Sequence, residues 1–103
     1  MPKWLTKVLE QLRDHLRKRT VRFTDKALRE IEAIALDEEA ALEILAGLGP
    51  DDFHDRIASS GSGEWMYIFK PDFEDLSLYV KFVIRAECVV VSLHEDRGED
   101  DEA

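Results

Sequence analysis

Residues 64–95 read E-W-M-Y-I-F-K-P-D-F-E-D-L-S-L-Y-V-K-F-V-I-R-A-E-C-V-V-V-S-L-H-E, and this stretch decides the fold. It contains three runs rich in aromatic and β-branched residues, separated by two short polar breaks. Such runs are typical of consecutive strands in an antiparallel meander. The sequence before residue 51 has a helical pattern, so we expect helices that pack on the sheet formed by this stretch.

Side chains alternate between the two faces of a strand, so each run predicts a buried face and an open face. In residues 76–85 the face covered by helices receives the apolar set Leu76, Leu78, Val80, Phe82 and Ile84. The open face receives Ser77, Tyr79, Lys81, Val83 and Arg85. The last strand is expected to place Val89, Val91 and Leu93 on one face and Cys88, Val90, Ser92 and His94 on the other.

Three helices are predicted before the sheet. Apolar residues recur at helical spacing over residues 3–19, and residues 20–23 follow as a short extended link. Thr24 is expected to cap the second helix and Asp37 the third. The second helix is expected to bury Ala27, Leu28, Ile31 and Ala35.

The link from the helices to the sheet allows two interpretations. Residues 51–58 fit either one more helical turn or a turn that leads into a first strand, and we favour the strand. Residues 59–63, S-S-G-S-G, are typical of a flexible loop, and because a strand follows them, a phosphate-binding loop is disfavoured.

These patterns predict an α+β fold in one domain, residues 1–95, with N-terminal helices packed on one face of an antiparallel sheet. Residues 96–103 are acidic and too polar to pack, so we expect a disordered tail.

The net charge of −9 is unevenly distributed along the chain. Residues 1–30 carry nine Lys/Arg and four Asp/Glu, whereas the remaining 73 residues carry five basic and 19 acidic side chains. The basic head suits a polyanion or an acidic partner, or it is simply a solvated helix face. The acidic total disfavours tight unspecific binding to nucleic acid, so we expect no binding to DNA by the chain alone.

The apolar segments are too short for a membrane span, and the first residues lead into an amphipathic helix rather than a signal peptide. Cys88 is the only cysteine and begins an apolar run, which predicts a buried structural thiol. Together these features predict a cytoplasmic protein that does not associate with membranes.

The open face of the sheet carries polar side chains that suit a phosphodiester. Cleavage of RNA without a metal needs one group to take the proton of the 2′-hydroxyl and another to protonate the leaving oxygen. It also needs positive charge where the charge of the phosphorane grows. Histidine exchanges protons near neutral pH, so His94 suits either proton role. The set comprises Tyr79, Lys81, Arg85, Ser92, His94 and, from the neighbouring first strand, His54 and Arg56.

The alternative is that these residues are the ordinary solvated surface of a two-layer protein. Motifs for metals and cofactors are missing from the sequence, which contains no cysteine pair, H-E-x-x-H, G-x-x-x-x-G-K or G-x-G-x-x-G. Neither a metal nor a cofactor is expected.

Three segments resemble motifs of the MqsR family of bacterial toxins, which belong to type II toxin–antitoxin pairs. Residues 21–28, V-R-F-T-D-K-A-L, are similar to the family's V-R-T-T-x-x-A-L. Residues 44–53, I-L-A-G-L-G-P-D-D-F, are similar to its helix end and its [I/L]-x-x-L-x-x-x-D-F-Y-K turn. Residues 65–93 are similar to its W-Q-D-V-Y-[R/K]-P, [I/V]-Y-x-K and V-V-V-S-F-[K/H] segments, in the same order. The likeness extends over residues 4–95.

The resemblance implies a fold like that of the RelE-type microbial ribonucleases, with helices on a curved antiparallel sheet. It implies an mRNA interferase, a toxin that cleaves transcripts endonucleolytically without a metal and arrests translation and growth. It also implies a cognate antitoxin, a helix-turn-helix protein encoded next door, that binds and neutralises the toxin.

The same resemblance assigns roles to residues. Tyr79 is the Tyr of Y-x-K and His94 is the basic residue that closes V-S-F-K, so these two are expected to move protons. Lys81 is the Lys of Y-x-K, and it is expected to hold the phosphate together with Arg56 and Lys70.

Two positions depart from the family pattern and motivate other hypotheses. The Gln after the Trp is Met66 here, and the Lys after D-F-Y is Asp55. A second hypothesis is therefore a catalytically degenerate member that acts as a protein-binding module. A third is an unrelated α+β domain that shares the pattern by chance.

Overall fold

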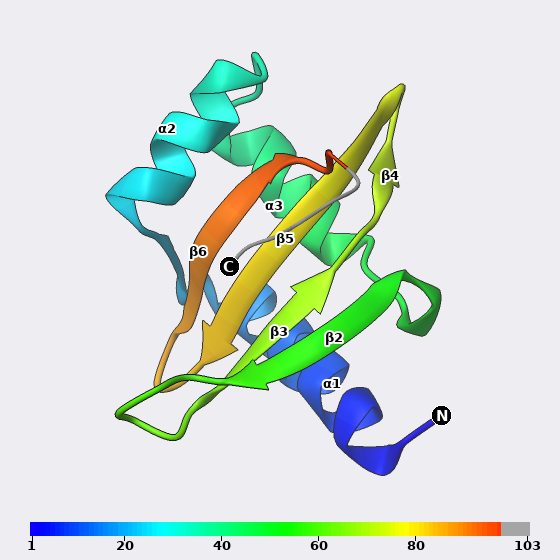
Figure 1. Cartoon of the computed structure of the whole chain (residues 1–103), viewed down its shortest axis with the longest axis vertical. Coiled ribbons are helices and arrows are strands. Elements are labelled where there is room, and N and C mark those ends of the chain that lie inside the picture. The colour runs from blue at the N-terminus through cyan, green and yellow to red at the C-terminus, as the bar shows by residue number, and fades with distance from the viewer. Residues whose placement is uncertain (98–103) are drawn as a thin grey trace.

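Helices and one mixed sheet make up residues 1–97, the part of the chain that this computed structural model describes (Figure 1). The α+β prediction is confirmed. The elements follow one another as α1 (Lys3–Lys18), β1 (Val21–Phe23), α2 (Asp25–Ala33), α3 (Glu38–Ala46), a 3₁₀ turn η1 (Pro50–Asp52), β2 (Phe53–Ala58), β3 (Trp65–Phe69), β4 (Asp72–Phe73), β5 (Leu76–Ile84) and β6 (Cys88–Glu95).

The strand order in the sheet is β1-β6-β5-β3-β2, with the short β4 paired to β5. The pairs between β2, β3, β5 and β6 are antiparallel, as expected. The expectation of a wholly antiparallel sheet is wrong, because the link after α1 forms β1 and pairs parallel to β6. Cys88 N donates to Thr20 O at 3.0 Å, and Thr24 N donates to Val90 O at 3.1 Å. The pairing gives partners to backbone groups that would otherwise lack them.

The helices α1 and α3 cover one face of the sheet, and no helix of residues 1–97 covers the other, open face, which is turned toward the viewer in Figure 1. The apolar stripe of α1 packs onto this covered face through Leu5, Val8, Leu9 and Leu12. The prediction for β5 is confirmed, since Leu78, Val80 and Phe82 have no exposed surface.

A β-bulge changes the faces of β6. Pairing moves from Lys81 opposite Ser92 to Phe82 opposite Val90, so Val91 is an extra residue. Cys88 and Val90 therefore join Leu93 in the core, and the expected grouping of β6 side chains is wrong.

The favoured interpretation of residues 51–58 is confirmed, because a 3₁₀ turn leads into β2. The register shifts in β2 as well. Phe53 pairs with Phe69, but the next residue of β3, Ile68, pairs with Asp55. His54 is the extra residue at this register shift. Each residue after it therefore lies on the opposite face of the sheet from the one that regular alternation would give it.

Both predicted helix caps are confirmed. Thr24 Oγ1 accepts from Ala27 N at 3.1 Å, and Asp37 Oδ1 accepts from Ala40 N at 2.9 Å. Two residues assigned to the buried face of α2 are not buried. Leu28 is 37% exposed, and Ala35 lies beyond the helix end with a left-handed φ of 61°. The helix ends before a full third turn could bring Ala35 onto the core.

The chain after β6 begins attached to the sheet, because Asp96 N donates to Ser77 O at 2.8 Å. The remainder of the predicted tail, residues 98–103, lies outside the described residues. No helix within residues 1–97 is long and apolar enough to cross a bilayer.

Candidate active site

Tyr79 and His94 meet on the open face of the sheet. They are direct cross-strand partners of β5 and β6, and their rings stack with centroids 4.8 Å apart and an interplanar angle of 11°. Their neighbours Val80 and Leu93 point into the core, so alternation fixes the pair on the opposite side. The structure thus brings together the two residues expected to move protons.

A backbone contact sets the tautomer of His94. Its Nδ1 lies 2.8 Å from the Glu95 carbonyl oxygen. A carbonyl oxygen can only accept, so Nδ1 carries the hydrogen and donates it. In the neutral ring, Nε2 is then left with its lone pair, which is the state that a general base requires.

Lys81 and Ser92 form the next cross-strand pair on this face. Each is two residues from Tyr79 or His94 along its strand, a step of about 6.6–6.8 Å. Lys81 is half-buried, and within residues 1–97 its ammonium has neither a hydrogen-bonding nor an ion-pairing partner. Ser92 is 2% exposed.

The helix α2 adds two charged residues that the sequence interpretation missed. Lys26 Nζ donates to Ser92 Oγ and to Glu30 Oε2, at 2.8 Å in both cases. Glu30 Oε1 accepts from Ser92 Oγ at 3.2 Å and from Leu93 N at 3.0 Å. The carboxylate therefore occupies the edge of β6 beyond the point where β1 ends.

The position of α2 follows from the short β1. The chain leaves β6 at Thr24, turns into α2 and runs beside the second half of β6 (Figure 1). An edge strand exposes backbone donors, and Glu30 supplies an acceptor for one of them. The parallel pairing of β1 with β6 is what brings α2 next to β6. No spacing in the sequence indicates that these two elements are neighbours.

Charges in this cluster act on one another. Burial lowers the pKa of Lys81, the ammonium of Lys26 lowers it further, and Glu30 partly offsets both. Burial alone would raise the pKa of Glu30, but the hydrogen bonds from Lys26 and from the Leu93 backbone, with the charges of Lys26 and His94, bring it below its ordinary value. The two ammonium groups thus repel one another, and the one carboxylate of Glu30 attracts both.

Arg56 lies elsewhere, and its expected place on the open face is wrong. It is opposite Tyr67, on the side of the sheet that α1 covers. Its guanidinium carbon lies 4.0 Å from the ring centroid of Trp4 and 4.0 Å from that of Trp65. The register shift at His54 turns Arg56 to this side, where it stacks between two indoles.

Lys70 follows β3 directly, and its Nζ lies 3.6 Å from Asp96 Oδ1. The Lys70 side chain is 23% exposed, so this ion pair is partly shielded. Arg85 is also engaged, since its Nε and Nη2 donate to the two carboxylate oxygens of Glu64 at 2.7 and 2.9 Å. Neither cation is as available to a ligand as Lys81.

The two positions that depart from the family pattern share the open face. Met66 is opposite Val83, and Asp55 is opposite Ile68. Asp55 is exposed, and its Oδ1 accepts from Arg56 N at 2.8 Å. The exposed carboxylate adds negative charge to the β2 side of this face.

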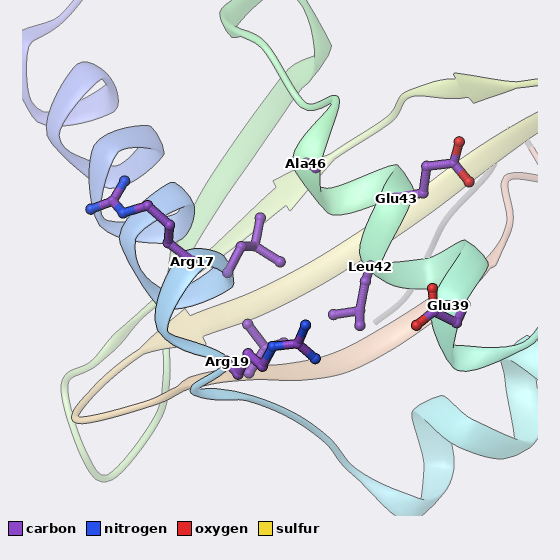
Figure 2. A pocket seen from close by; sticks show the side chains of 8 residues that line it. Arg17, Arg19, Glu39, Leu42, Glu43 and Ala46 are labelled. Carbon is purple, nitrogen blue, oxygen red and sulfur yellow. The ribbon is translucent and has the colours of Figure 1, made fainter.

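A groove of about 530 Å³ opens on the helix-covered side, between the end of α1, β1 and α3 (Figure 2). The candidate proton-transfer residues do not line it. Its lining consists of Leu16, Arg17, Arg19, Val21, Glu39, Leu42, Glu43 and Ala46.

Cys88 is buried, as predicted, and burial raises the pKa of its thiol to about 12. The thiol therefore stays protonated at neutral pH and is a poor nucleophile. Among the described residues, no three His, Cys, Asp or Glu side chains gather in the way that a metal site requires.

The comparison with known families agrees with the motifs. A family model described as motility quorum-sensing regulator, toxin of MqsA, matches residues 5–95. No curated protein matches the chain significantly. The family match covers every strand of the sheet and all of the helices except the first two residues of α1, and it includes Tyr79 and His94. The chain therefore belongs to the MqsR toxin family.

Proposed function

We propose that this toxin is a metal-independent endoribonuclease that cleaves mRNA and thereby arrests translation and growth. The observation that supports this most is the stacked pair of Tyr79 and His94, with the ammonium of Lys81, which has no hydrogen-bonding or ion-pairing partner within residues 1–97, beside it. Two proton-transfer groups and a cation are the minimum that phosphodiester cleavage by the 2′-hydroxyl requires.

The reaction assigns one role to each group. His94 Nε2 takes the proton of the 2′-hydroxyl as O2′ bonds to phosphorus. The P–O5′ bond breaks, and O5′ takes a proton from the Tyr79 hydroxyl. The products are a 2′,3′-cyclic phosphate and a 5′-hydroxyl. Lys81 stabilises the charge that grows on the non-bridging oxygens.

Lys70 has a secondary role in this proposal, because its ion pair with Asp96 must open before it meets a phosphate. Arg56 has no role in holding the phosphate, since its guanidinium stacks between Trp4 and Trp65 on the other side of the sheet.

The family description names an antitoxin as the partner of this kind of toxin. We propose that a cognate antitoxin, encoded beside the toxin, neutralises this chain in the cytoplasm. The substrate is mRNA, and the acidic total charge makes binding to DNA by the toxin alone unfavourable.

A second candidate function is protein binding without catalysis. The exposed Asp55 carboxylate on the open face favours it, because a negative charge repels phosphate. A chain with this function would bind its antitoxin tightly and leave RNA intact.

Induced expression in a bacterial host tests the nuclease proposal. The wild type should arrest growth and create new 5′ ends in transcripts at a shared short sequence. Tyr79→Phe keeps the ring but loses the hydroxyl, and His94→Ala loses the base, so each should reduce cleavage by about 10²- to 10⁴-fold.

His54→Ala is the matched control, because His54 is an exposed histidine at the irregularity between β2 and β3, away from the stacked pair. It should arrest growth like the wild type. Growth arrest by a soluble Tyr79→Phe, His94→Ala double variant at matched expression would contradict the proposal. Absence of arrest by folded wild type would favour the binding module.

A further inference from the structure

The open face carries a second feature beside the stacked pair, a cluster of charged and polar side chains that includes Lys81. Lys26 from α2 and Lys81 from β5 flank Ser92 on β6, and Lys26 Nζ is held 2.8 Å from Ser92 Oγ. These three residues come from three elements and converge on one patch. The sequence separates Lys26 from Lys81 by 55 positions, so only the fold brings them together.

The charge balance of the patch favours an anion. The Lys26 side chain is 60% exposed. Its ion-pair partner Glu30 also accepts a hydrogen bond from the backbone N–H of Leu93 on β6. Lys81 forms no ion pair with any described residue, the Lys26 ammonium repels it, and the Glu30 carboxylate attracts it from beyond ion-pair distance. The repulsion between two like charges held together in this way is relieved when an anion binds between them. The buried Ser92 hydroxyl accepts from Lys26 and donates to Glu30, so it helps to hold the Lys26 ammonium in place.

We propose that Lys26 and Lys81 form a clamp for one phosphate group of the bound RNA, and that Glu30 is a positioning residue that holds Lys26 in place. The inference rests on the proposed function and extends it, because it gives α2 a part in substrate binding. The clamp lies one cross-strand pair away from Tyr79 and His94, so the phosphate it holds is the one at the cleavage site or the next one along the strand.

Equilibrium binding tests the clamp apart from catalysis. In the His94→Ala background, which should cleave RNA too slowly to disturb a binding measurement, the fluorescence anisotropy of a labelled single-stranded RNA gives Kd at several salt concentrations. Lys26→Gln should weaken binding by about tenfold. It should also reduce the slope of log Kd against log[salt] by about 0.7, the value for one phosphate contact to a single strand.

Three further variants sharpen the result. Lys7→Gln makes the same change in charge on the exposed side of α1, and it should leave Kd and slope unchanged. Lys26→Arg keeps the charge and should restore the slope. Because both lysines hold one phosphate, the double variant Lys26→Gln, Lys81→Gln should lose no more slope than either single variant.

Glu30→Gln should weaken RNA binding by a few-fold while Lys26 retains its charge. Thermal unfolding must show that each variant is folded. If Lys26→Gln does not fold, the clamp is tested with Lys26→Arg, which keeps the charge and changes only its geometry. The clamp is overturned if Lys26→Gln binds RNA like Lys7→Gln, whether or not the wild type cleaves. A Lys26-dependent slope in a chain whose wild type never cleaves would retain the clamp and reject the nuclease.

Discussion

The guanidinium of Arg56 illustrates how much one residue depends on the register of its strand. It stacks between Trp4 of α1 and Trp65 of β3, and so fastens the first turn of the helix to the edge of the sheet. Arginine over an aromatic ring contributes about 0.5–2 kcal/mol per contact, depending on its exposure. The interaction is structural, and it removes Arg56 from the set of phosphate-binding candidates.

Replacement of Arg56 separates these two roles. Arg56→Met should lower the free energy of unfolding by about 1–3 kcal/mol, because both ring contacts are lost. RNA cleavage per folded molecule should stay within about twofold of the wild type, a difference too small to reflect lost transition-state stabilisation. Urea denaturation and a cleavage assay measure the two effects.

Arg29→Met is the control for the Arg56 variant, since Arg29 is exposed on α2 and has no ion pair with any residue in the described part of the chain. Its effect on stability should be within about 0.5 kcal/mol. Loss of cleavage in a fully stable Arg56→Met variant would return Arg56 to the active site.

Residue types alone predict some of the site and miss the rest. Tyr79 and Lys81 alternate onto the open face of an unbroken strand, so a period of two is enough to place them. Lys26 and Glu30 lie on a helix, where the same types are ordinary surface residues. Their part in the site depends on contacts with Ser92 and Leu93, more than 60 positions away.

Among the elements, β6 differs most from its sequence pattern. The run C-V-V-V is apolar at every position, so either face could be buried and the pattern cannot reveal an extra residue. The bulge at Val91 allows Cys88 and Val90 to enter the core while Ser92 and His94 stay on the open face. Core and candidate site thus depend on the same irregularity.

Deletion of Val91 tests the importance of the bulge. Without the extra residue, the pairs Lys81–Ser92 and Phe82–Val90 can follow one another directly, so the side chains of β6 keep the same faces. The deletion variant should therefore keep His94 beside Tyr79 and lose no more than about 1 kcal/mol in urea denaturation. Val91→Ala keeps the chain length and should likewise cost about 1 kcal/mol or less. A much larger loss in the deletion variant would contradict this and would show that the bulge itself stabilises the sheet.

At the scale of the whole molecule, charge is distributed unevenly, both along the chain and between the helix layer and the sheet. The first 30 residues are basic, yet the total is −9. Most cations of α1 belong to the helix layer, behind the sheet that carries the candidate site (Figure 1). RNA bound on the open face would meet few cations, so we infer a small electrostatic contribution to affinity.

The salt dependence of RNA binding measures this contribution. With contacts to one or two phosphates, the slope of log Kd against log[salt] should be about 0.7–1.4. The α1 variant Lys7→Gln should leave that slope unchanged. A slope of about 4 or more would mean that the basic α1 binds RNA as well, and the open face would then be only part of the interface.

The fold as a whole was predictable where local rules agree. Caps at Thr24 and Asp37 and the apolar face of β5 follow from side-chain chemistry and period. The parallel strand β1 is only three residues long, and its hydrogen bonds to β6 join positions that are far apart in the chain. No local pattern distinguishes such a strand from an extended link.

The most direct test of the central claim uses the purified chain and a single-stranded RNA, in a buffer that contains a metal chelator. The wild type should cut the RNA internally and leave 2′,3′-cyclic phosphate and 5′-hydroxyl ends, while folded His94→Ala should be slower by about 10²-fold or more. RNA that stays intact with folded wild type, or equal cleavage by His94→Ala, would contradict the assignment of Tyr79 and His94 as the proton-transfer pair of a nuclease.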